Sequence, residues 1–377
     1  MTVFFHPPIP KAFISKIKPY VGGLSHIQGA KNPLKLSSNE NTLGPSPKAI
    51  EACRAVCSKK LARYPDGAHT VLKKAIASVH NLPLQQIICG AGSDQLFTLL
   101  AQAYLNQGDE AIYTEYGFLM YRIVTLAAGG TPICVPEKNL KACPDTILSA
   151  VTERTRIVFL ANPNNPTGTF LNTAELGYIA RNLPEQTIFV IDSAYAEYAY
   201  DGNSGHSNAE DYSDGHALVD EFSNVLVTRT LSKIYGLAGL RIGWGHASVQ
   251  ILDAMERVRE PFNLSTPALY AGEAALYDQD YIQSCVADNV RNRQWVLENL
   301  QGMNVECVPS RANFLLIKPK TPDIKGKNSA AAVAEALRSQ NIIVRELCEY
   351  SLPDYLRVTI GSQEECQKFI DALSNIY

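Results

Sequence analysis

Short apolar segments alternate with helical segments along most of this chain, and this alternation restricts the fold more than any other feature. Six of these segments are rich in β-branched and aromatic residues and are bounded by turn residues, which is typical of strands. They are residues 85–90, 110–115, 131–136, 155–162, 186–192 and 224–231. Helical patterns fill several of the intervals, so we predict an α/β fold with a mainly parallel sheet sandwiched by helices.

The pattern changes after Pro261, where long helical segments come first and three further strand-like segments follow. These strands are predicted at residues 313–319, 341–347 and 355–361. We therefore interpret residues 45–260 as a large domain and residues 261–377 as a smaller C-terminal domain of the α+β type.

Three other segments have distinct local patterns. Residues 1–44 are rich in proline, glycine and asparagine, which predicts an extended N-terminal arm, without packed elements of its own, that lies against the small domain. Residues 46–64 start with a serine N-cap and a proline at the first helical position, which predicts a helix. The acidic, apolar-poor residues 201–216 are predicted to form a solvated surface loop.

Composition limits the classes of function. The 377 residues carry 34 basic and 37 acidic side chains, so no basic surface for nucleic acid or a membrane is expected. The nine cysteines include no C-x-x-C pair and the seven histidines form no H-x-x-x-H pattern, which argues against a metal site and a disulfide scaffold. Prolines interrupt the N-terminal segment where a signal peptide would be apolar, and no apolar run has the roughly 18 residues of a membrane span. We expect a cytoplasmic protein with reduced thiols.

The turn after the first strand is a candidate anion site. In open α/β sheets ligands bind beyond the carboxyl ends of the strands, so the residues that close each strand carry the functional information. Gly92, Ser93 and Asp94 open a helix, and the amides of such a turn bind anions with the help of the helix dipole. Gln95 stands where a dinucleotide-binding fingerprint requires its third glycine, which argues against a nicotinamide oxidoreductase.

The following strands end in side chains of varied chemistry. Phe118 can stack on a flat ring, Asn165 lies in the proline-flanked turn PNNPTG, Asp192 closes its strand, and Tyr195 comes three residues later. Taken singly, Asp192 could be a helix cap, Asn165 a turn residue and Phe118 a core residue. On successive strand ends, they indicate one ligand site.

A lysine follows the last of these strands, in the stretch TRTLSKIYGLAGLRIGWG. Lys233 stands beside Ser232 and eight residues before Arg241. A lysine after a strand usually extends into solvent, because a buried one costs free energy unless something binds or modifies it. The whole set of groups matches pyridoxal 5′-phosphate, which offers an aldehyde, a ring nitrogen, a phenolate oxygen and a phosphate.

Several motifs resemble those of a known family. PNNPTG, DSAY and TLSKIYGLAGLRIGW are similar to the pyridoxal-phosphate aminotransferases of fold type I. LSSNENTLGPSPKA, RYPDG, GAGSD and YLRVTIG resemble the histidinol-phosphate aminotransferase group, and the likeness runs from about Tyr20 to the C-terminus. The chain departs from the family at Phe118, where a tyrosine is often found, so ring stacking is kept and a hydroxyl contact is not.

The resemblance implies roles for the cofactor residues. Lys233 would bond to the cofactor aldehyde and then move a proton as general base and acid, while Asp192 would pair with the ring nitrogen. Asn165 and Tyr195 would hydrogen-bond the phenolate oxygen. The phosphate would be held by Gly92, Ser93, Asp94, Ser232 and Arg241, with Phe118 stacked on the ring.

The resemblance also implies an assembly and a reaction. The assembly is a homodimer with shared active sites, in which Tyr64 reaches the cofactor phosphate bound by the other subunit. Substrate would be bound by Arg357, with Arg345, Tyr20 and Asn41 nearby, because a guanidinium suits carboxylate and phosphate alike. The reaction would transfer the amino group of L-histidinol phosphate to 2-oxoglutarate, giving imidazole acetol phosphate and glutamate.

Three alternatives share the same residues. An aromatic or tyrosine aminotransferase is the nearest, and a pyridoxal-phosphate decarboxylase differs in which bond at Cα is oriented for cleavage. A catalytically inactive binding protein on this scaffold is disfavoured because Lys233, Asp192, Tyr195 and Arg241 are all present.

Overall fold

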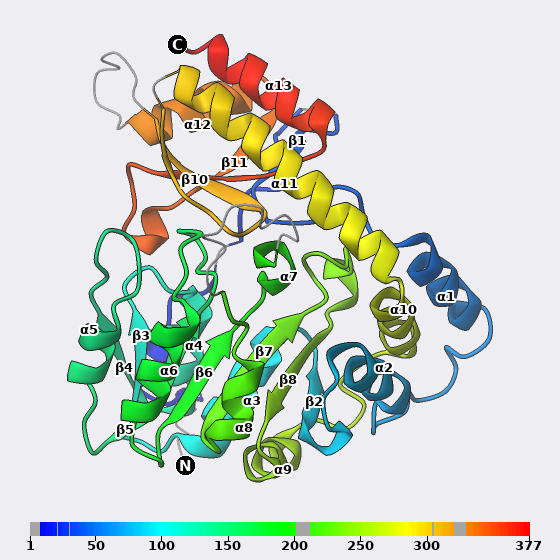
Figure 1. Ribbon diagram of the computed structural model, residues 1–377, viewed down its shortest axis with the longest axis vertical. Helices are drawn as coiled ribbons and strands as arrows, with labels where there is room; N and C mark the ends of the chain where they lie inside the picture. Colours follow the sequence, from blue (N-terminus) through cyan, green and yellow to red (C-terminus); the bar gives the residue numbers. More distant parts are fainter. Residues whose placement is uncertain (1–7, 21, 30, 201–211, 304, 320–328) are drawn as a thin grey trace, which may run out of the picture.

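The computed structural model describes residues 8–20, 22–29, 31–200, 212–303, 305–319 and 329–377. The chain forms two sheets, a large one in the lower part of Figure 1 and a smaller one above it. The large sheet has seven strands in the order β2-β8-β7-β6-β5-β3-β4. Their bounds are β2 Ile87–Gly90, β3 Glu110–Thr114, β4 Thr131–Val135, β5 Thr155–Ala161, β6 Ile188–Asp192, β7 Val225–Thr230 and β8 Gly243–Ala247.

The predicted α/β class and the six predicted strands are confirmed, and one strand of the large sheet, β8, was missed. Strands β3 to β7 pair in parallel, whereas β8 is antiparallel to both of its neighbours, β2 and β7. The sequence of β8, GWGHA, contains two glycines and therefore does not look like a strand. Gly243 is needed there because a Cβ at this position would stand 2.3 Å from the Ser93 amide nitrogen.

Helices cover both faces of the large sheet, because alternate residues of its strands point to opposite sides. On one face, Ile157 and Phe159 of β5 pack with α3 (Ser93–Tyr104), α4 (Leu119–Ala128) and α9 (Val249–Val258). On the other face, Val158 and Leu160 pack with α5 (Pro144–Ser149), α6 (Thr173–Asn182) and α8 (His216–Glu221). The arrows of β6 and β7 in Figure 1 point toward the second sheet, so their carboxyl ends face it.

A third group of helices closes the β2 side of the large sheet. It comprises α1 (Pro47–Cys57), α2 (Thr70–His80) and α10 (Thr266–Tyr277), whose apolar residues share one buried cluster with Trp244 of β8. The helix predicted over residues 46–64 is thus shorter than expected. The amides of Lys59 and Lys60 both bond to the carbonyl of Val56, and this turn ends α1.

The second sheet has five strands in the order β1-β11-β12-β10-β9. Their bounds are β1 Leu34–Leu36, β9 Glu306–Val308, β10 Phe314–Lys318, β11 Ile342–Glu346 and β12 Leu356–Thr359. The prediction of an arm without packed elements is wrong for β1, which pairs in parallel with β11. Hydrogen bonds between these backbones stabilise a strand whose sequence, flanked by turn residues, gives only a weak signal.

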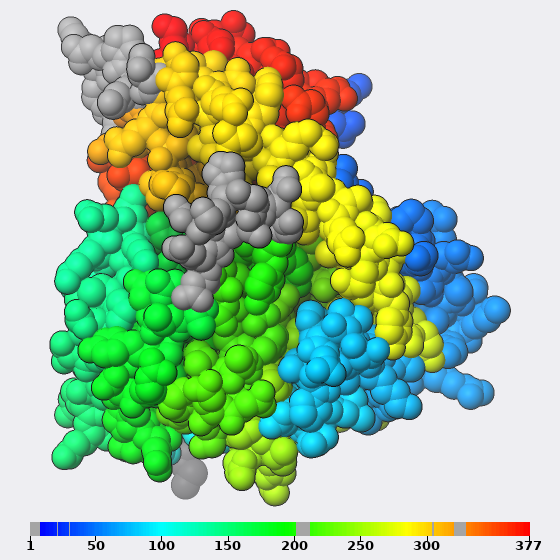
Figure 2. Space-filling view, viewed as in Figure 1, coloured from blue at the N-terminus to red at the C-terminus, as the bar shows by residue number. Residues whose placement is uncertain are grey.

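Three helices pack on the second sheet, α11 (Gln279–Gly302), α12 (Ser329–Ser339) and α13 (Gln363–Ser374). Figure 2 shows α11, in yellow, as a continuous ridge from the second sheet down to α1 and α2. Its first turns bury Ile282 in the same cluster as α10, and its last turns bury Val296 and Leu300 against the second sheet. The predicted domain division at residue 260 stays a prediction, since α10 packs with α1 and α2 rather than with the second sheet.

The remaining elements are short. They are α7 Ala196–Ala199 and the 3₁₀ helices η1 Ile14–Lys16, η2 Leu84–Gln86, η3 Ala238–Leu240 and η4 Cys348–Tyr350. The predicted loop 201–216 lies outside the described residues up to position 211. From Tyr212 onward it is not a solvated loop, because the Tyr212 hydroxyl donates to the Asn162 carbonyl and Asp214 accepts from Arg229. Among the described helices, none has both the length and the apolar character that a membrane span requires.

Candidate active site

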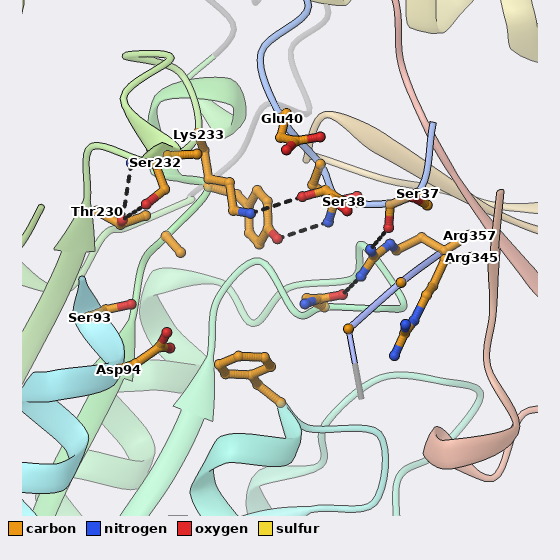
Figure 3. Close-up of a pocket in the computed structure, with 18 of the residues that line it drawn as sticks. Ser37, Ser38, Glu40, Ser93, Asp94, Thr230, Ser232, Lys233, Arg345 and Arg357 are labelled. Atoms are coloured by element: carbon orange, nitrogen blue, oxygen red, sulfur yellow. Dashed lines mark hydrogen bonds between the residues drawn. The ribbon is translucent and has the colours of Figure 1, made fainter. Parts of the chain in front are cut away.

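A cavity of about 450 Å³ lies where the carboxyl ends of the large-sheet strands meet the second sheet. Most of the predicted site residues line it. They are Tyr20, Ser93, Asp94, Phe118, Asn165, Asp192, Tyr195, Ser232, Lys233, Arg241, Arg345 and Arg357. In Figure 3, Ser93 and Asp94 lie at one end of the view, Arg345 and Arg357 at the other, and Lys233 between them.

The anion site at the start of α3 is built by close backbone approach. Gly92 is the N-cap and has φ of 79°, a conformation that favours glycine. A Cβ on Gly92 would also lie 2.6 Å from Nη2 of Arg241. The first turn of a helix leaves its amides unpaired, so the start of α3 and the guanidinium form one electropositive end of the cavity.

Arg241 is oriented by several polar contacts. Its Nη2 lies 3.2 Å from the carboxylate of Asp94, and its Nη1 donates to the Ser232 hydroxyl at 3.3 Å. Ser232 is held in turn by Thr230, whose hydroxyl donates to the Ser232 hydroxyl and accepts from the Ser232 amide. Burial raises the pKa of Asp94, while Arg241 opposes that rise.

Lys233 extends from the loop after β7 into the middle of the cavity. Its Nζ donates to the Ser38 carbonyl at 3.2 Å, as the dashed line in Figure 3 shows. Burial and the positive charge of Arg357 lower the pKa of this amine from 10.5 to about 8. The lysine therefore does not extend into solvent, and a substantial fraction of its amine is neutral near pH 8.

Asp192 ends β6 at the floor of the cavity. Tyr121 of α4 donates to its Oδ2 at 2.8 Å, and Thr228 of β7 donates to its Oδ1 at 3.3 Å. Burial raises the pKa of this carboxyl to about 6, and both donors counteract that rise by stabilising the ionised form. The group is ionised at neutral pH in spite of being only 5% exposed.

Tyr195 is buried and receives a hydrogen bond that the sequence did not predict. Nδ2 of Asn39 donates to its hydroxyl oxygen at 2.9 Å. Asn39 is itself fixed by Thr359 of β12, which accepts from its amide and donates to its side-chain oxygen. Burial raises the pKa of Tyr195, so the phenol remains a donor toward the cavity at neutral pH.

Arg357 of β12 reaches the cavity from the second sheet. Its Nη2 donates to the Ser37 carbonyl at 2.6 Å, and its Nη1 donates to the side-chain oxygen of Asn165. Its Nε is buried without a hydrogen-bond partner among the described residues. Burial lowers the pKa of this guanidinium, but arginine stays charged in proteins, so the cavity contains a desolvated cation available to an anionic ligand.

Arg345 and two tyrosines complete this end of the cavity. Arg345 of β11 lies opposite Arg357 in the register of the antiparallel pair and forms an ion pair with Glu349 at 3.0 Å. Tyr350 is buried, and Tyr20 packs edge-on against Phe118 with ring centroids 6.5 Å apart. The spacing of the two arginines on adjacent strands concentrates positive charge on one side of the cavity.

Three predicted site residues do not line the cavity. Gly92 is the N-cap of α3, and its lack of a side chain leaves room for Arg241, as described above. Asn41 was predicted to bind substrate, but it does not face this cavity. Its side-chain amide donates to the carbonyl of Ile234 at 2.7 Å, and it lines a separate small cavity with Cys285. Tyr64 is 83% exposed and stacks on Phe262 at the surface, so within one chain it does not reach the cavity.

The sequence reasoning missed Asn39, Tyr121 and Tyr350. A signal existed for Tyr121, since it lies three residues after Phe118 and therefore on the same face of a helix. Asn39 differs from Asn41 by only two positions in the same SSNEN motif, and the sequence offered no means of choosing between them.

Comparison with known proteins agrees with this geometry. The family profile described as aminotransferase class I and II matches residues 31–373. The histidinol-phosphate aminotransferase of Dinoroseobacter shibae is 47% identical over 365 residues, which cover 97% of each protein. The chain belongs to the aminotransferase class I and II family. Within that family it belongs to the histidinol-phosphate aminotransferase group, as the sequence motifs predicted.

Further relatives of this aminotransferase give the same result. The histidinol-phosphate aminotransferase of Ruegeria pomeroyi is 45% identical, with 97% of this chain and 96% of that protein covered. The crystal structure of histidinol-phosphate aminotransferase from Sinorhizobium meliloti in complex with pyridoxal-5′-phosphate superimposes with a TM-score of 0.86. It is 26% identical, and the match covers 97% of this chain and 96% of that one.

Proposed function

We propose that this aminotransferase uses pyridoxal 5′-phosphate to transfer the amino group of L-histidinol phosphate to 2-oxoglutarate, giving imidazole acetol phosphate and glutamate. One observation carries the proposal. The Lys233 amine, with its pKa lowered to about 8, lies in one cavity with the buried carboxylate of Asp192 and the buried guanidinium of Arg357. An amine, an anion and a cation of this kind are the groups that amino transfer from an anionic substrate requires.

The residues present fit the cofactor. Its phosphate suits the start of α3, where a Cβ on Gly92 or Gly243 would collide with its neighbours and where Arg241 and Ser232 converge. Its ring nitrogen suits Asp192, its phenolate oxygen suits Tyr195 and Asn165, and its ring face suits Phe118. When bound, the cofactor supplies an electron sink for the carbanion that forms at the substrate Cα.

The chain's own residues perform the proton transfers and hold the charges. Lys233 would take the proton from the substrate Cα and deliver it again as a general acid, because a neutral amine with a pKa near working pH is an effective general base. Asp192 would keep the ring nitrogen of the bound cofactor protonated through a charge-assisted bond, which its burial would strengthen. The Tyr195 hydroxyl accepts a hydrogen bond from Asn39, which orients it so that its own proton would be donated to the phenolate oxygen of the cofactor.

Arg357 accounts for the use of two different substrates. Histidinol phosphate has a phosphate in the position where glutamate has its α-carboxylate. Glutamate is the product formed from the acceptor 2-oxoglutarate. A planar guanidinium binds either anion through paired hydrogen bonds. Arg345 and Tyr20 line the same end of the cavity and would supply the additional donors that a phosphate can use.

The shared active site is also a proposal. Tyr64 stacks on Phe262, both rings are exposed, and Tyr64 lines a surface hollow together with Lys59, Lys60 and Arg63. Such a surface is suited to a second copy of the chain whose cofactor phosphate would meet Tyr64. The cytoplasmic location expected from the sequence likewise remains a prediction.

A coupled assay tests the function. Purified protein is given 2-oxoglutarate with either histidinol phosphate or phenylalanine, and glutamate formation is followed. Phenylalanine leaves unpaired the donors that would bind the phosphate of histidinol phosphate, and each buried unpaired group costs roughly 1–3 kcal/mol. We therefore expect kcat/KM for phenylalanine to be lower than for histidinol phosphate by about one to two orders of magnitude per unpaired donor. Equal or better efficiency with phenylalanine would favour an aromatic aminotransferase instead.

A further inference from the structure

Tyr121 contacts both Asp192 and Phe118, the two residues that would touch the ring nitrogen and the ring face of the proposed cofactor. No step of the reaction requires Tyr121 directly. It is 1% exposed, and its ring stacks on Phe159 with centroids 4.9 Å apart and an interplanar angle of 3°. Its edge meets Phe97 and Phe118, at 5.3 and 5.9 Å. Three aromatic rings therefore fix the direction in which the Tyr121 hydroxyl points.

That hydroxyl points at the carboxylate of Asp192. The 2.8 Å bond to Oδ2 is shorter than the 3.3 Å bond that Thr228 makes to Oδ1. An ionised carboxylate can only accept, so the phenol is the donor. Burial and the Asp192 charge raise the pKa of Tyr121 well above 10, which keeps the proton on the phenol.

We infer that Tyr121 is a positioning residue for cofactor binding, which holds Asp192 ionised and oriented through Oδ2 so that Oδ1 remains available to the ring nitrogen. The inference rests on the proposed function. The same side chain touches Phe118, so one residue orients both the carboxylate that faces the ring nitrogen and the ring that covers the cofactor face. Both contacts come from the start of α4, because Phe118 is its N-cap and Tyr121 lies in its first turn.

The groups around Asp192 determine the pH dependence that follows. Tyr121 faces it from α4, Thr228 from β7 and Asp94 from α3, with the Ala194 amide beside it. Tyr121, Thr228 and the amide stabilise the ionised form, and the Asp94 charge opposes it. Removal of the Tyr121 hydroxyl takes away the shorter of the two side-chain donors, so the Asp192 pKa should rise from about 6 toward neutrality.

The test measures cofactor affinity rather than turnover. Wild type and Tyr121→Phe are titrated from pH 5 to 8 with pyridoxal 5′-phosphate and with the analogue in which carbon replaces the ring nitrogen. The variant should bind the cofactor about threefold more weakly at pH 6.5 and about tenfold more weakly at pH 5, because the midpoint of the affinity profile should move up by about one pH unit. The analogue carries the same phosphate and no ring nitrogen, so its affinity and pH profile should be unchanged.

Several outcomes would overturn the inference. Equal weakening for the cofactor and the analogue would show a merely structural role, and an unmoved midpoint would show that Tyr121 does not act through Asp192. Thr228→Val is the second variant, with a smaller shift expected in the same direction, and Tyr113→Phe on β3 is the matched control with no shift. A shift with Thr228→Val but none with Tyr121→Phe would also contradict it. Failure of the wild type to bind the cofactor would instead refute the proposed function.

Discussion

The two walls of the cavity are built in different ways. The large-sheet wall consists of residues at strand ends, namely Ser93, Asp94, Asp192, Ser232 and Lys233. The second-sheet wall consists of Ser37, Asn39, Arg345, Tyr350 and Arg357. Each residue of the first wall either ends its strand, as Asp192 does, or comes within four residues after it. Those of the second wall come from the N-terminal arm and the last strands, some 320 residues apart, as in the bond between Arg357 and the Ser37 carbonyl.

This difference separates two tasks. The large-sheet wall is rigid because parallel strands and buried helices on both faces fix its residues, and such a frame suits cofactor chemistry common to both half-reactions. The second-sheet wall is assembled by hydrogen bonds between distant segments, and it carries the positive charges of Arg345 and Arg357, which under the proposed function would distinguish substrates. Substitutions in the first wall should therefore affect every substrate, and those in the second should affect some more than others.

The largest effect is expected for Lys233→Ala. Loss of the amine removes both the covalent link to the cofactor and the general base, so transamination should fall by at least about 10⁴-fold with every substrate. Turnover with histidinol phosphate and with phenylalanine, alongside borohydride bleaching of the yellow wild type, provides the measurement. Lys73→Ala, which breaks an ion pair with Glu256 far from the cavity, serves as control. A colourless wild type that cannot be reconstituted would contradict the prediction.

Asp192→Asn should have the next largest effect. The neutral amide cannot keep the ring nitrogen protonated, so kcat should fall by about 10²–10³-fold in both half-reactions while the protein remains folded. Single-turnover kinetics and thermal unfolding measure the two quantities. Asp278→Asn, another buried aspartate that pairs with Lys48, is the matched control. Near-native turnover would show that Asp192 does not face the cofactor.

The second-sheet wall gives a smaller and substrate-dependent effect. Arg357→Ala should lower kcat/KM by about a hundredfold with both histidinol phosphate and glutamate, because both anions lose their main cation. Arg345→Ala should weaken the reaction of histidinol phosphate about tenfold more than that of phenylalanine. Arg357→Lys keeps the charge and separates lost charge from lost geometry. Equal effects of Arg345→Ala on the two amines would remove the distinction between the walls.

The pH dependence of cofactor capture tests whether the positive charge of Arg357 in the second-sheet wall affects Lys233 in the large-sheet wall. Burial, assisted by Arg357, lowers the pKa of Lys233 to about 8, so its amine is neutral above pH 8 and charged below it. Capture of the cofactor aldehyde by the apoprotein needs the neutral amine, so its rate should increase by about a hundredfold between pH 6 and 9. Stopped-flow absorbance measures the rate. Arg357→Gln removes a positive neighbour and should move the midpoint upward, whereas an unchanged midpoint would show that the walls are electrostatically independent.

The smallest effect is expected for Asn39→Ala. Tyr195 loses its donor, which should reduce transamination by about tenfold. The residue has φ of 56°, which alanine adopts poorly, so unfolding free energy should also fall by about 1 kcal/mol. Asn81→Ala, at an exposed helix end with φ of 53°, should show the loss of stability without the loss of activity. If both variants lose activity equally, the bond to Tyr195 has no catalytic role.

The sequence determined most of the large sheet and its wall of the cavity. Apolar segments between helical ones predicted six strands, and the residues that close those strands predicted Asp192, Lys233 and the start of α3. This works because the carboxyl ends of parallel strands necessarily meet at one edge, so local signals suffice to place residues there. Arg357 was predicted differently, from the resemblance of its YLRVTIG motif to the histidinol-phosphate aminotransferase group.

Only the tertiary structure decided what depends on contacts between distant segments. It made residues 34–36 a strand through pairing with β11, selected Asn39 rather than Asn41 for the cavity, and brought Tyr121 to Asp192. The same holds for the lowered pKa of Lys233, which results from burial and from Arg357, more than a hundred residues away. Local sequence patterns determine which side chains are available, but hydrogen-bond direction and burial depend on elements that meet only when the chain is folded.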